Sequence, residues 1–292
     1  MASFKDIRLN LHFNLIDKIT QGYIITTLLY LTFFSFLLDS VWLHVLIRIV
    51  FVGIISYMAW LSPKIKNRLF QFVRNAYPLI LFGLFYAETD YLNNLIFSTN
   101  LDPLIEKLEL SFFGFHPSIA FSQALPQVWF SELMNFGYFS YYALILLLPL
   151  WLWFKGNESF TYTIFIITFS FYIFYWIFIF FPVAGPQFYL EESYRTIPNS
   201  GLFRYLVRFA EWLGEGPTAA FPSSHVGIMV IMALLSYRYA KALLPFYIFF
   251  GILICFSTVY IKAHYAIDVI GGIVVAPILY VLSNWVYNKL NK

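Results

Sequence analysis

The sequence contains very little charge. Only 11% of its 292 residues are Asp, Glu, Lys or Arg, while 61% are hydrophobic and 22% are aromatic. A soluble domain has about 25% charged and about 45–50% apolar residues, so this composition excludes a water-soluble fold and predicts that lipid is the solvent. The net charge of +3 is too small to indicate a nucleic-acid partner. The single cysteine, Cys255, excludes an internal disulfide and says nothing about redox compartment.

The chain also has no Ser/Gly-rich linker, charge block, internal repeat or low-complexity tract. Its first 20 residues carry several charges and no apolar core, so no cleavable signal peptide is expected. Within them, residues 7–16 alternate as a strand would and fit an interfacial helix about equally well. The membrane setting favours the helix.

Apolar segments long enough to cross a bilayer recur along the chain, since a spanning helix needs about 20 apolar residues. We expect an all-α, polytopic transmembrane bundle of about six to eight spans. The first two segments are separated only by Asp39 and Ser40, so they form a tight hairpin or a re-entrant pair, and Glu88 and Asp90 interrupt the third. The predicted spans are 21–38, 41–61, 77–97, 132–153, 160–181, 224–240, 243–260 and 266–287.

The basic residues are distributed unevenly over the predicted loops. If all the segments cross, both termini lie on one side, and that side holds most of the Lys and Arg residues. The positive-inside rule then places the termini in the cytoplasm. His225 starts its span from the opposite side, and so do His264 and Asp268. We therefore expect these three titratable groups to converge at the non-cytoplasmic face.

One part of the long outer loop 182–223 is amphipathic. The segment LFRYLVRFAEWLG, residues 202–214, has an apolar stripe on one helical face and charged residues opposite. This pattern predicts a helix lying in the membrane interface, with Arg204 and Arg208 toward lipid headgroups. The stripe consists of Phe203, Leu206, Val207, Ala210 and Leu213, and the charged residues are Arg204, Arg208 and Glu211.

The segment AHYAIDVIGG, residues 263–272, places His264 and Asp268 four positions apart, on one face of a helix. A carboxylate in that position can accept the imidazole Nδ1–H and leave Nε2 free, which makes the histidine a poised nucleophile or base. Gly271 and Gly272 let another helix approach closely, and the expected neighbour is the helix that carries His225.

The segment FPSSHVG, residues 221–227, adds a second set of groups. Pro222 suits the first turn of a helix, and Ser223 and Ser224 lie beside it. Free amides and hydroxyls at a helix N-terminus form a site for an anion such as phosphate. The alternative for the two serines is that they only cap the helix.

PSSH followed by STVYIKAHYAID resembles the paired signatures of the type 2 phosphatidic acid phosphatase superfamily. The resemblance covers the C-terminal half of the chain. It implies a six-helix catalytic core in which His264 attacks phosphorus to form a phosphohistidine. Asp268 would orient that histidine, and His225 would protonate the leaving alcohol. The resemblance implies no metal and no other cofactor.

Two departures from the phosphatase branch stand out. The chain has no Arg-Pro pair, and Thr258 follows Ser257 where that branch has an arginine. In both departures the sequence resembles the branch that contains inositol phosphorylceramide synthase and sphingomyelin synthase-like transferases. The segments 108–118, 135–145 and 181–189 are also similar to that branch, although Glu109 stands where an aspartate is common.

Because two cations are missing, another must offset the phosphate charge in a site of low dielectric constant. Arg195, in the irregular part of the outer loop, is the first candidate, and Lys262, which lies just before His264, is the second. Each has an ordinary alternative. Arg195 is equally explained as a solvated loop residue, and Lys262 as an interfacial snorkelling lysine.

We therefore expect an integral membrane lipid phosphotransferase whose partners are the bilayer, a lipid phosphate or phospholipid donor, and an alcohol acceptor. A lipid phosphate phosphatase that uses water at the same site is the alternative. A proton-coupled transporter or scramblase is the remote alternative. Residues 1–20 are expected to form a cytoplasmic or interfacial segment, 21–75 a transmembrane hairpin, and 76–292 the catalytic domain.

Overall fold

The computed structural model describes residues 11–195, 197, 201–214 and 216–292. Every regular element in this part of the chain is a helix, so the predicted all-α class is confirmed. Helices are the expected outcome, because a helix bonds its own backbone groups where lipid offers no hydrogen-bond partners.

Nine helices form the body of the described structure, eight of them 15 to 27 residues long and one of 9 residues. They are α1 (Leu15–Phe33), α2 (Val41–Leu61), α3 (Arg68–Ala76), α4 (Pro78–Leu92), α7 (Val128–Phe154), α8 (Ser159–Phe180), α12 (Ser224–Tyr239), α13 (Leu244–Tyr260) and α14 (Ala266–Leu290). The connections contain the shorter helices α5 (Asp102–Phe113), α6 (Pro117–Ala124), α9 (Pro186–Tyr189), α10 (Glu192–Arg195) and α11 (Leu202–Gly214).

Five of the described helical segments are long and apolar enough to cross a membrane: α2, α7, α8, α13 with its preceding turn, and α14. The predicted spans 77–97 and 224–240 correspond to α4 and α12, which have only 15 and 16 residues. The predicted span 21–38 corresponds to α1, whose sequence includes polar and charged residues at its start. These three helices belong to the bundle, but none of them is by itself long and apolar enough to count as a membrane span.

The first helix begins earlier than predicted. Asn14 caps α1 through reciprocal bonds with Asp17, each 2.9 Å long, so the helix starts at Leu15 and takes in residues 15–20 of the segment expected to lie at the interface. Residues 11–14 are not helical, and the rest of the predicted interfacial helix lies outside the described residues.

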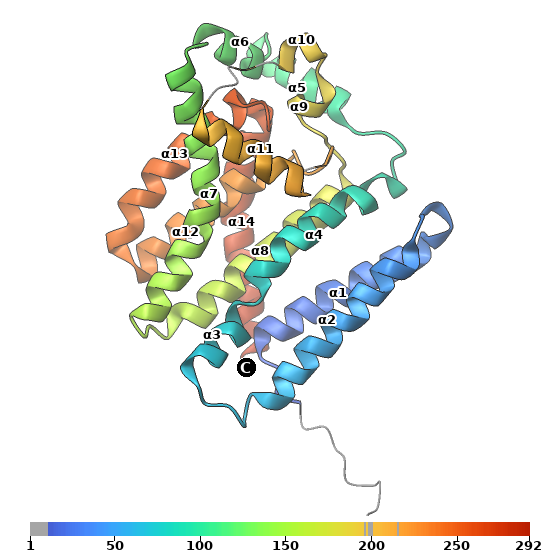
Figure 1. Ribbon diagram of the computed structural model, residues 1–292, viewed down its shortest axis with the longest axis vertical. Helices are drawn as coiled ribbons and strands as arrows, with labels where there is room; N and C mark the ends of the chain where they lie inside the picture. The colour runs from blue at the N-terminus through green and yellow to red at the C-terminus, as the bar shows by residue number, and fades with distance from the viewer. Residues whose placement is uncertain (1–10, 196, 198–200, 215) are drawn as a thin grey trace, which may run out of the picture.

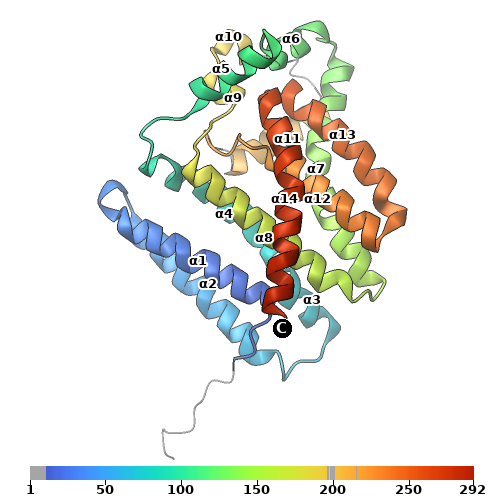
Figure 2. The ribbon, with the colours of Figure 1, turned by 180° about the vertical axis from the view of Figure 1, so that it is seen from behind.

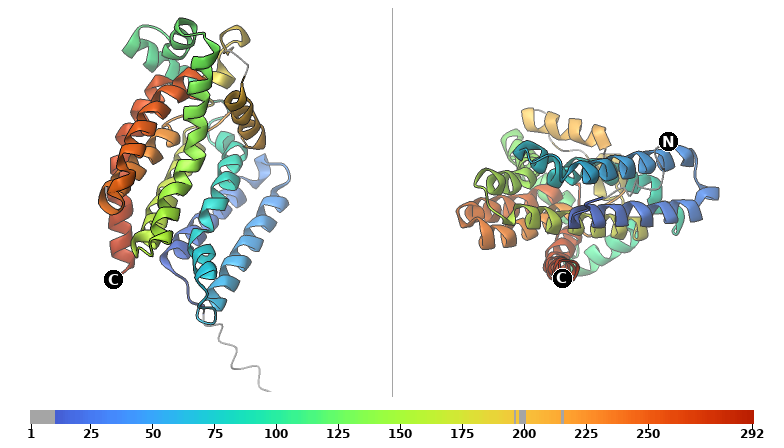
Figure 3. Two further views of the ribbon diagram at one scale, coloured as in Figure 1. Left: turned by 60° about the vertical axis from the view of Figure 1, so that its left-hand side comes forward. Right: turned by 90° about the horizontal axis from the view of Figure 1, so that it is seen from below.

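The helices are arranged with α7, α12, α13 and α14 on one side and the α1–α2 hairpin on the other, with α4 and α8 between them (Figures 1 and 2). The short helices α5, α6, α9 and α10 gather at one end of the bundle, and the C-terminal end of α14 lies at the opposite end, near α3 (Figures 1 and 3). The N-terminal ends of α12 and α14 point toward the end with the short helices.

Buried ion pairs connect the hairpin to the rest of the bundle. Arg48, inside the second span, contacts both carboxylate oxygens of Glu88 in α4 at 2.7 and 2.9 Å, and His44 contacts the same carboxylate at 2.6 Å. Arg74 of α3 pairs with Asp17 of α1. Charges are tolerated at membrane depth when they are paired in this way.

The outer-loop helix is present at residues 202–214, but its orientation differs from the prediction. Leu213 of the predicted apolar stripe is 63% exposed, whereas Val207 of the same stripe is buried against the protein. Arg204 and Glu211, assigned to the polar face, are only 14% and 23% exposed and lie 3.6 Å apart. The exposed face of the helix carries Tyr205, Phe209 and Trp212 instead. Aromatic side chains are favourable at this position, since their rings are stable at the membrane–water interface.

Candidate active site

The start of α12 and the start of α14 meet at the end of the bundle that carries the short helices. Their approach is close at Gly272, where a β-carbon would lie 2.5 Å from the carbonyl oxygen of Ser223 and 3.3 Å from the amide of Gly227. The prediction that the glycine pair admits the helix carrying His225 is confirmed. This contact determines the distance between the two histidines.

The two histidines face each other. His264 Nε2 lies 3.3 Å from His225 Nδ1, and both side chains are buried. His264 Nδ1 lies 2.8 Å from the carbonyl oxygen of Ala220. A carbonyl oxygen only accepts hydrogen bonds, so Nδ1 must carry the proton and Nε2 is left as an acceptor. The rings of Tyr138 and Tyr141, both from α7, pack against His225 at 4.7 and 4.4 Å between centroids.

Asp268 is fully buried beside this pair, but it is not the closest acceptor for His264. Its Oδ2 lies 3.5 Å from His264 Nδ1 and accepts the amide of Tyr265 at 2.8 Å. Its backbone carbonyl accepts the amide of Ser223 at 3.0 Å, which ties α14 to the cap of α12. The hydrogen-bond partner of Nδ1 is therefore Ala220, whereas we expected Asp268, and the carboxylate adds negative charge near the same nitrogen.

The two serines have distinct positions. Ser223 caps α12, since its hydroxyl accepts the amide of Val226 at 3.4 Å. Ser224 is buried in the first turn. Among the described residues, none accepts a hydrogen bond from the backbone amides of Ser224 and His225. Such amides at a helix N-terminus are the groups that bind anions.

Lys262 lies in the connection between α13 and α14, where its φ of 69° gives a left-handed turn. Its side chain is 1% exposed, so it is not a snorkelling lysine. Burial, reinforced by the nearby charge of Arg204, lowers the pKa of Lys262 to about 8. Arg204 therefore belongs to the inward face of α11, close to Lys262, and does not face lipid headgroups as we expected. The side chain of Arg195 in α10 lies outside the described part of the structure.

Asp102, a buried carboxylate of α5, holds two loops of the site. It accepts the amides of Ala184 at 2.7 Å and Gly185 at 2.8 Å, and the hydroxyl of Tyr265 at 3.0 Å. Gly185 has a φ of 93°, and a β-carbon there would lie 2.8 Å from the carbonyl oxygen of Ala263, so the loop approaches His264 closely only because it has no side chain at this position. Burial raises the pKa of Asp102.

Glu109, about two helical turns further along the same face of α5, holds the start of α14. It accepts the amide of Ala266 at 2.6 Å. Burial raises the pKa of Glu109 to about 7, and the negative charge of Asp268 acts in the same direction. Neither Asp102 nor Glu109 is among the site residues predicted from the sequence. Their spacing of seven, which places both on one face of a helix, is the pattern that could have indicated them.

The arrangement is suited to nucleophilic and acid–base chemistry on an anion. It combines an imidazole whose unprotonated Nε2 faces a second imidazole, helix N-terminal amides, and the buried Lys262, which lies two residues before His264. No group of three or more His, Cys, Asp or Glu side chains in the described residues could hold a metal ion. The structure thus brings together His225, His264, Asp268 and Ser223, with Ser224 between Ser223 and His225 in the chain. Lys262 lies buried in the connection that leads to His264.

Comparison with known families gives one match. A family model described as PAP2 superfamily matches residues 105–282, which is more than half of the chain and includes both histidines, Asp268 and Glu109. No curated protein and no solved structure matches the sequence.

Proposed function

The chain belongs to the PAP2 superfamily and is an enzyme of the lipid phosphatase or phosphotransferase type, and from this premise we propose that it is a lipid phosphotransferase that acts through a phosphohistidine. In this proposal a lipid phosphate or phospholipid is the donor and an alcohol is the acceptor. The observation that carries it is the contact between His264 Nε2 and His225 Nδ1 at 3.3 Å in a buried site.

The first half-reaction transfers the phosphoryl-linked group to the enzyme. His264 Nε2 attacks phosphorus, a P–N bond forms, and the P–O bond to the leaving alkoxide breaks. His225, as the imidazolium, gives its Nδ1 proton to that oxygen and becomes neutral, so the alcohol leaves neutral. The Ala220 carbonyl and the Asp268 carboxylate stabilise the positive charge that develops on the His264 ring, since both lie on its Nδ1 side.

The second half-reaction reverses these roles. The acceptor hydroxyl gives its proton to His225 and its oxygen attacks phosphorus, while the P–N bond to His264 breaks. Substrate must first separate the two rings, because phosphorus needs to lie about 3–3.5 Å from the attacking nitrogen and the leaving oxygen about 2.6–3.2 Å from the acid. We propose that the amides of Ser224 and His225, together with Lys262, hold the phosphate oxygens during this exchange.

Transfer to an alcohol is supported over hydrolysis by two features. The cations of the phosphatase branch are absent from the sequence, and both histidines are less than 10% exposed, which limits access for water. We also propose that the termini are cytoplasmic and that the site faces the opposite side, because most basic residues lie with the termini. Residues 76–292 are proposed to form the catalytic domain.

The experiment is a product analysis with purified protein in detergent. Radiolabelled phospholipid and lipid monophosphate donors are incubated with candidate alcohols, and the products are separated by chromatography. We expect a new phosphodiester or phosphoester of the acceptor, and little inorganic phosphate without an acceptor. Phosphate release that is equally fast without any alcohol would identify a phosphatase instead.

The matched pair of variants is His264→Gln and His12→Gln. The first removes the proposed nucleophile and should abolish product formation. The second changes an exposed histidine near the start of α1 and should leave the rate unchanged. A protein that cleaves no bond before or after either change would be a transporter or scramblase, and the proposal would be wrong.

A further inference from the structure

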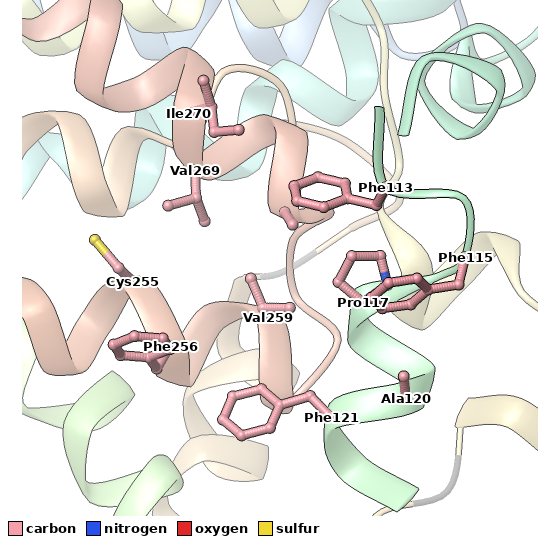
Figure 4. Close-up of a pocket in the computed structure, with 11 residues that line it drawn as sticks. Phe113, Phe115, Pro117, Ala120, Phe121, Cys255, Phe256, Val259, Val269 and Ile270 are labelled. Carbon is pink, nitrogen blue, oxygen red and sulfur yellow. The ribbon is translucent and has the colours of Figure 1, made fainter. Parts of the chain in front are cut away.

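A cavity of about 520 Å³ lies outside the histidine site, between α13 and α14 and beneath the short helices α5 and α6 (Figure 4). Its lining is entirely apolar. From the α5–α6 segment it receives four large groups, Phe113, Phe115, Pro117 and Phe121. The opposite wall consists of Cys255, Phe256 and Val259 from α13 and Ala266, Val269 and Ile270 from α14.

A second cavity of about 640 Å³ adjoins the first, since Phe115 and Ala120 line both. This one is partly polar and lies toward the end of the bundle. Among the described residues, its lining includes two carboxylates and no lysine or arginine, and His116 lies 3.5 Å from one of these carboxylates, that of Glu106. The polar groups are Glu106, His116, Gln123, Tyr189, Glu191 and Tyr194.

We propose that the two cavities form one binding cleft for a lipid whose headgroup donates hydrogen bonds and carries no negative charge. The apolar part, flanked by two helices long enough to cross the membrane, is suited to a hydrocarbon chain. The polar part offers carboxylate and amide oxygens, which accept hydrogen bonds from hydroxyl groups. A phosphate in the same place would meet two like charges, and no lysine or arginine among the described lining residues would offset them.

The cleft adjoins the histidine site through a short chain of contacts. Ala266, which lines the apolar cavity, donates its amide to Glu109 at 2.6 Å. The other oxygen of Glu109 lies 4.0 Å from His116, which lines the polar cavity. A lipid in the cleft thus touches the first turn of α14 from outside, while Lys262 and the histidines lie on the inside. Charge distinguishes the two sites, because Lys262 lies beside the histidine site, whereas the described lining of the polar cavity has two carboxylates and no lysine or arginine.

The test uses the only cysteine of the chain, Cys255, as a reporter on the cleft wall. Wild-type protein in nanodiscs is treated with N-ethylmaleimide, and alkylation is followed by mass spectrometry. The discs contain either a diacylglycerol or the phosphatidic acid with the same chains. The proposal predicts that diacylglycerol slows alkylation about fivefold, as expected at roughly 80% occupancy of one site. Phosphatidic acid should have little effect.

Three variants sharpen the test, and none of them belongs to the histidine site. Ala120→Trp fills the junction of the cavities at an exposed position, so it should abolish the protection by diacylglycerol, whereas Ile278→Trp, on the lipid-facing surface of α14, should not. Glu106→Lys should make phosphatidic acid the better protectant. Equal alkylation with and without lipid, or equal protection by both lipids in the wild type, would overturn the proposal. Because phosphatidic acid is a lipid phosphate of the proposed donor class, the comparison is repeated in His264→Gln, which cannot turn it over, so the result is independent of the proposed reaction.

Discussion

Replacing Gly272 with alanine tests the contact that sets the distance between the histidines. The added methyl group would lie 2.5 Å from the carbonyl oxygen of Ser223 and 3.3 Å from the amide of Gly227. The Ser223 carbonyl cannot turn away cheaply, because it accepts the amide of Gly227 in the first turn of α12. A carbon and an oxygen pack at about 3.3–3.6 Å, so α12 and α14 must move apart by about 1 Å.

The size of the effect follows from this displacement. A misplacement of about 1 Å in a positioned catalytic pair costs about 100-fold in rate, which corresponds to about 2.7 kcal/mol in the activation free energy. Overpacking also costs about 1–3 kcal/mol of folding stability, partly offset by the better helix propensity of alanine. We therefore expect kcat/KM to fall about 100-fold, with a smaller loss in thermal stability.

The assay compares kcat/KM for the lipid donor and the midpoint of thermal unfolding in detergent. Gly83→Ala in α4 is the control, since a β-carbon there meets nothing within 4 Å, and it should leave activity unchanged. Gly271→Ala should have an intermediate effect, because its methyl group meets the movable ring of Phe221 at 2.9 Å. If Gly272→Ala kept more than half of the wild-type kcat/KM, the helix contact would not control the site.

Three further changes test the charges around the site. Burial raises the pKa of Glu109 to about 7 from the ordinary 4.5, so the folded protein keeps a proton that the unfolded chain loses in this interval, and stability should fall as pH rises from 4.5 to 7. In Glu109→Gln the unfolding midpoint should change less between these pH values. The stability difference that disappears is about 1–2 kcal/mol after allowance for solvent screening. Lys262, with a pKa lowered to about 8, should lose its charge above that pH, so KM for the donor should rise on the alkaline side in the wild type and stay flat in Lys262→Arg. Glu88→Gln leaves Arg48 buried without its partner and should lower the unfolding midpoint by an amount worth about 3–5 kcal/mol, while kcat of the folded protein is unchanged.

The convergence of His225, His264 and Asp268 was predictable from the sequence, because helices that alternate in direction bring their corresponding ends to one membrane face. The close approach at Gly272 was predictable for a similar reason. A small residue in an apolar helix has value only where another helix packs against it. Both predictions depend on local patterns and on the direction of the chain.

The partners of these groups were not predictable, because they come from distant segments. Ala220 accepts from His264, and Asp102 accepts from Tyr265 across 163 positions of the chain, pairings that no spacing rule indicates. The predicted orientation of α11 was wrong for a different reason. A charged helical face packs either toward headgroups or toward a polar protein interior, and only the tertiary structure shows that Arg204 lies inward, near Lys262.

The most direct test of the account is the identification of the residue that becomes phosphorylated. Purified protein is mixed with a radiolabelled donor for a single turnover, quenched in alkali, where phosphohistidine is stable, and digested for mass spectrometry. The account predicts the label on His264 alone, and its loss in His264→Gln. A label on His225, or turnover with no labelled enzyme at any time, would contradict the central claim.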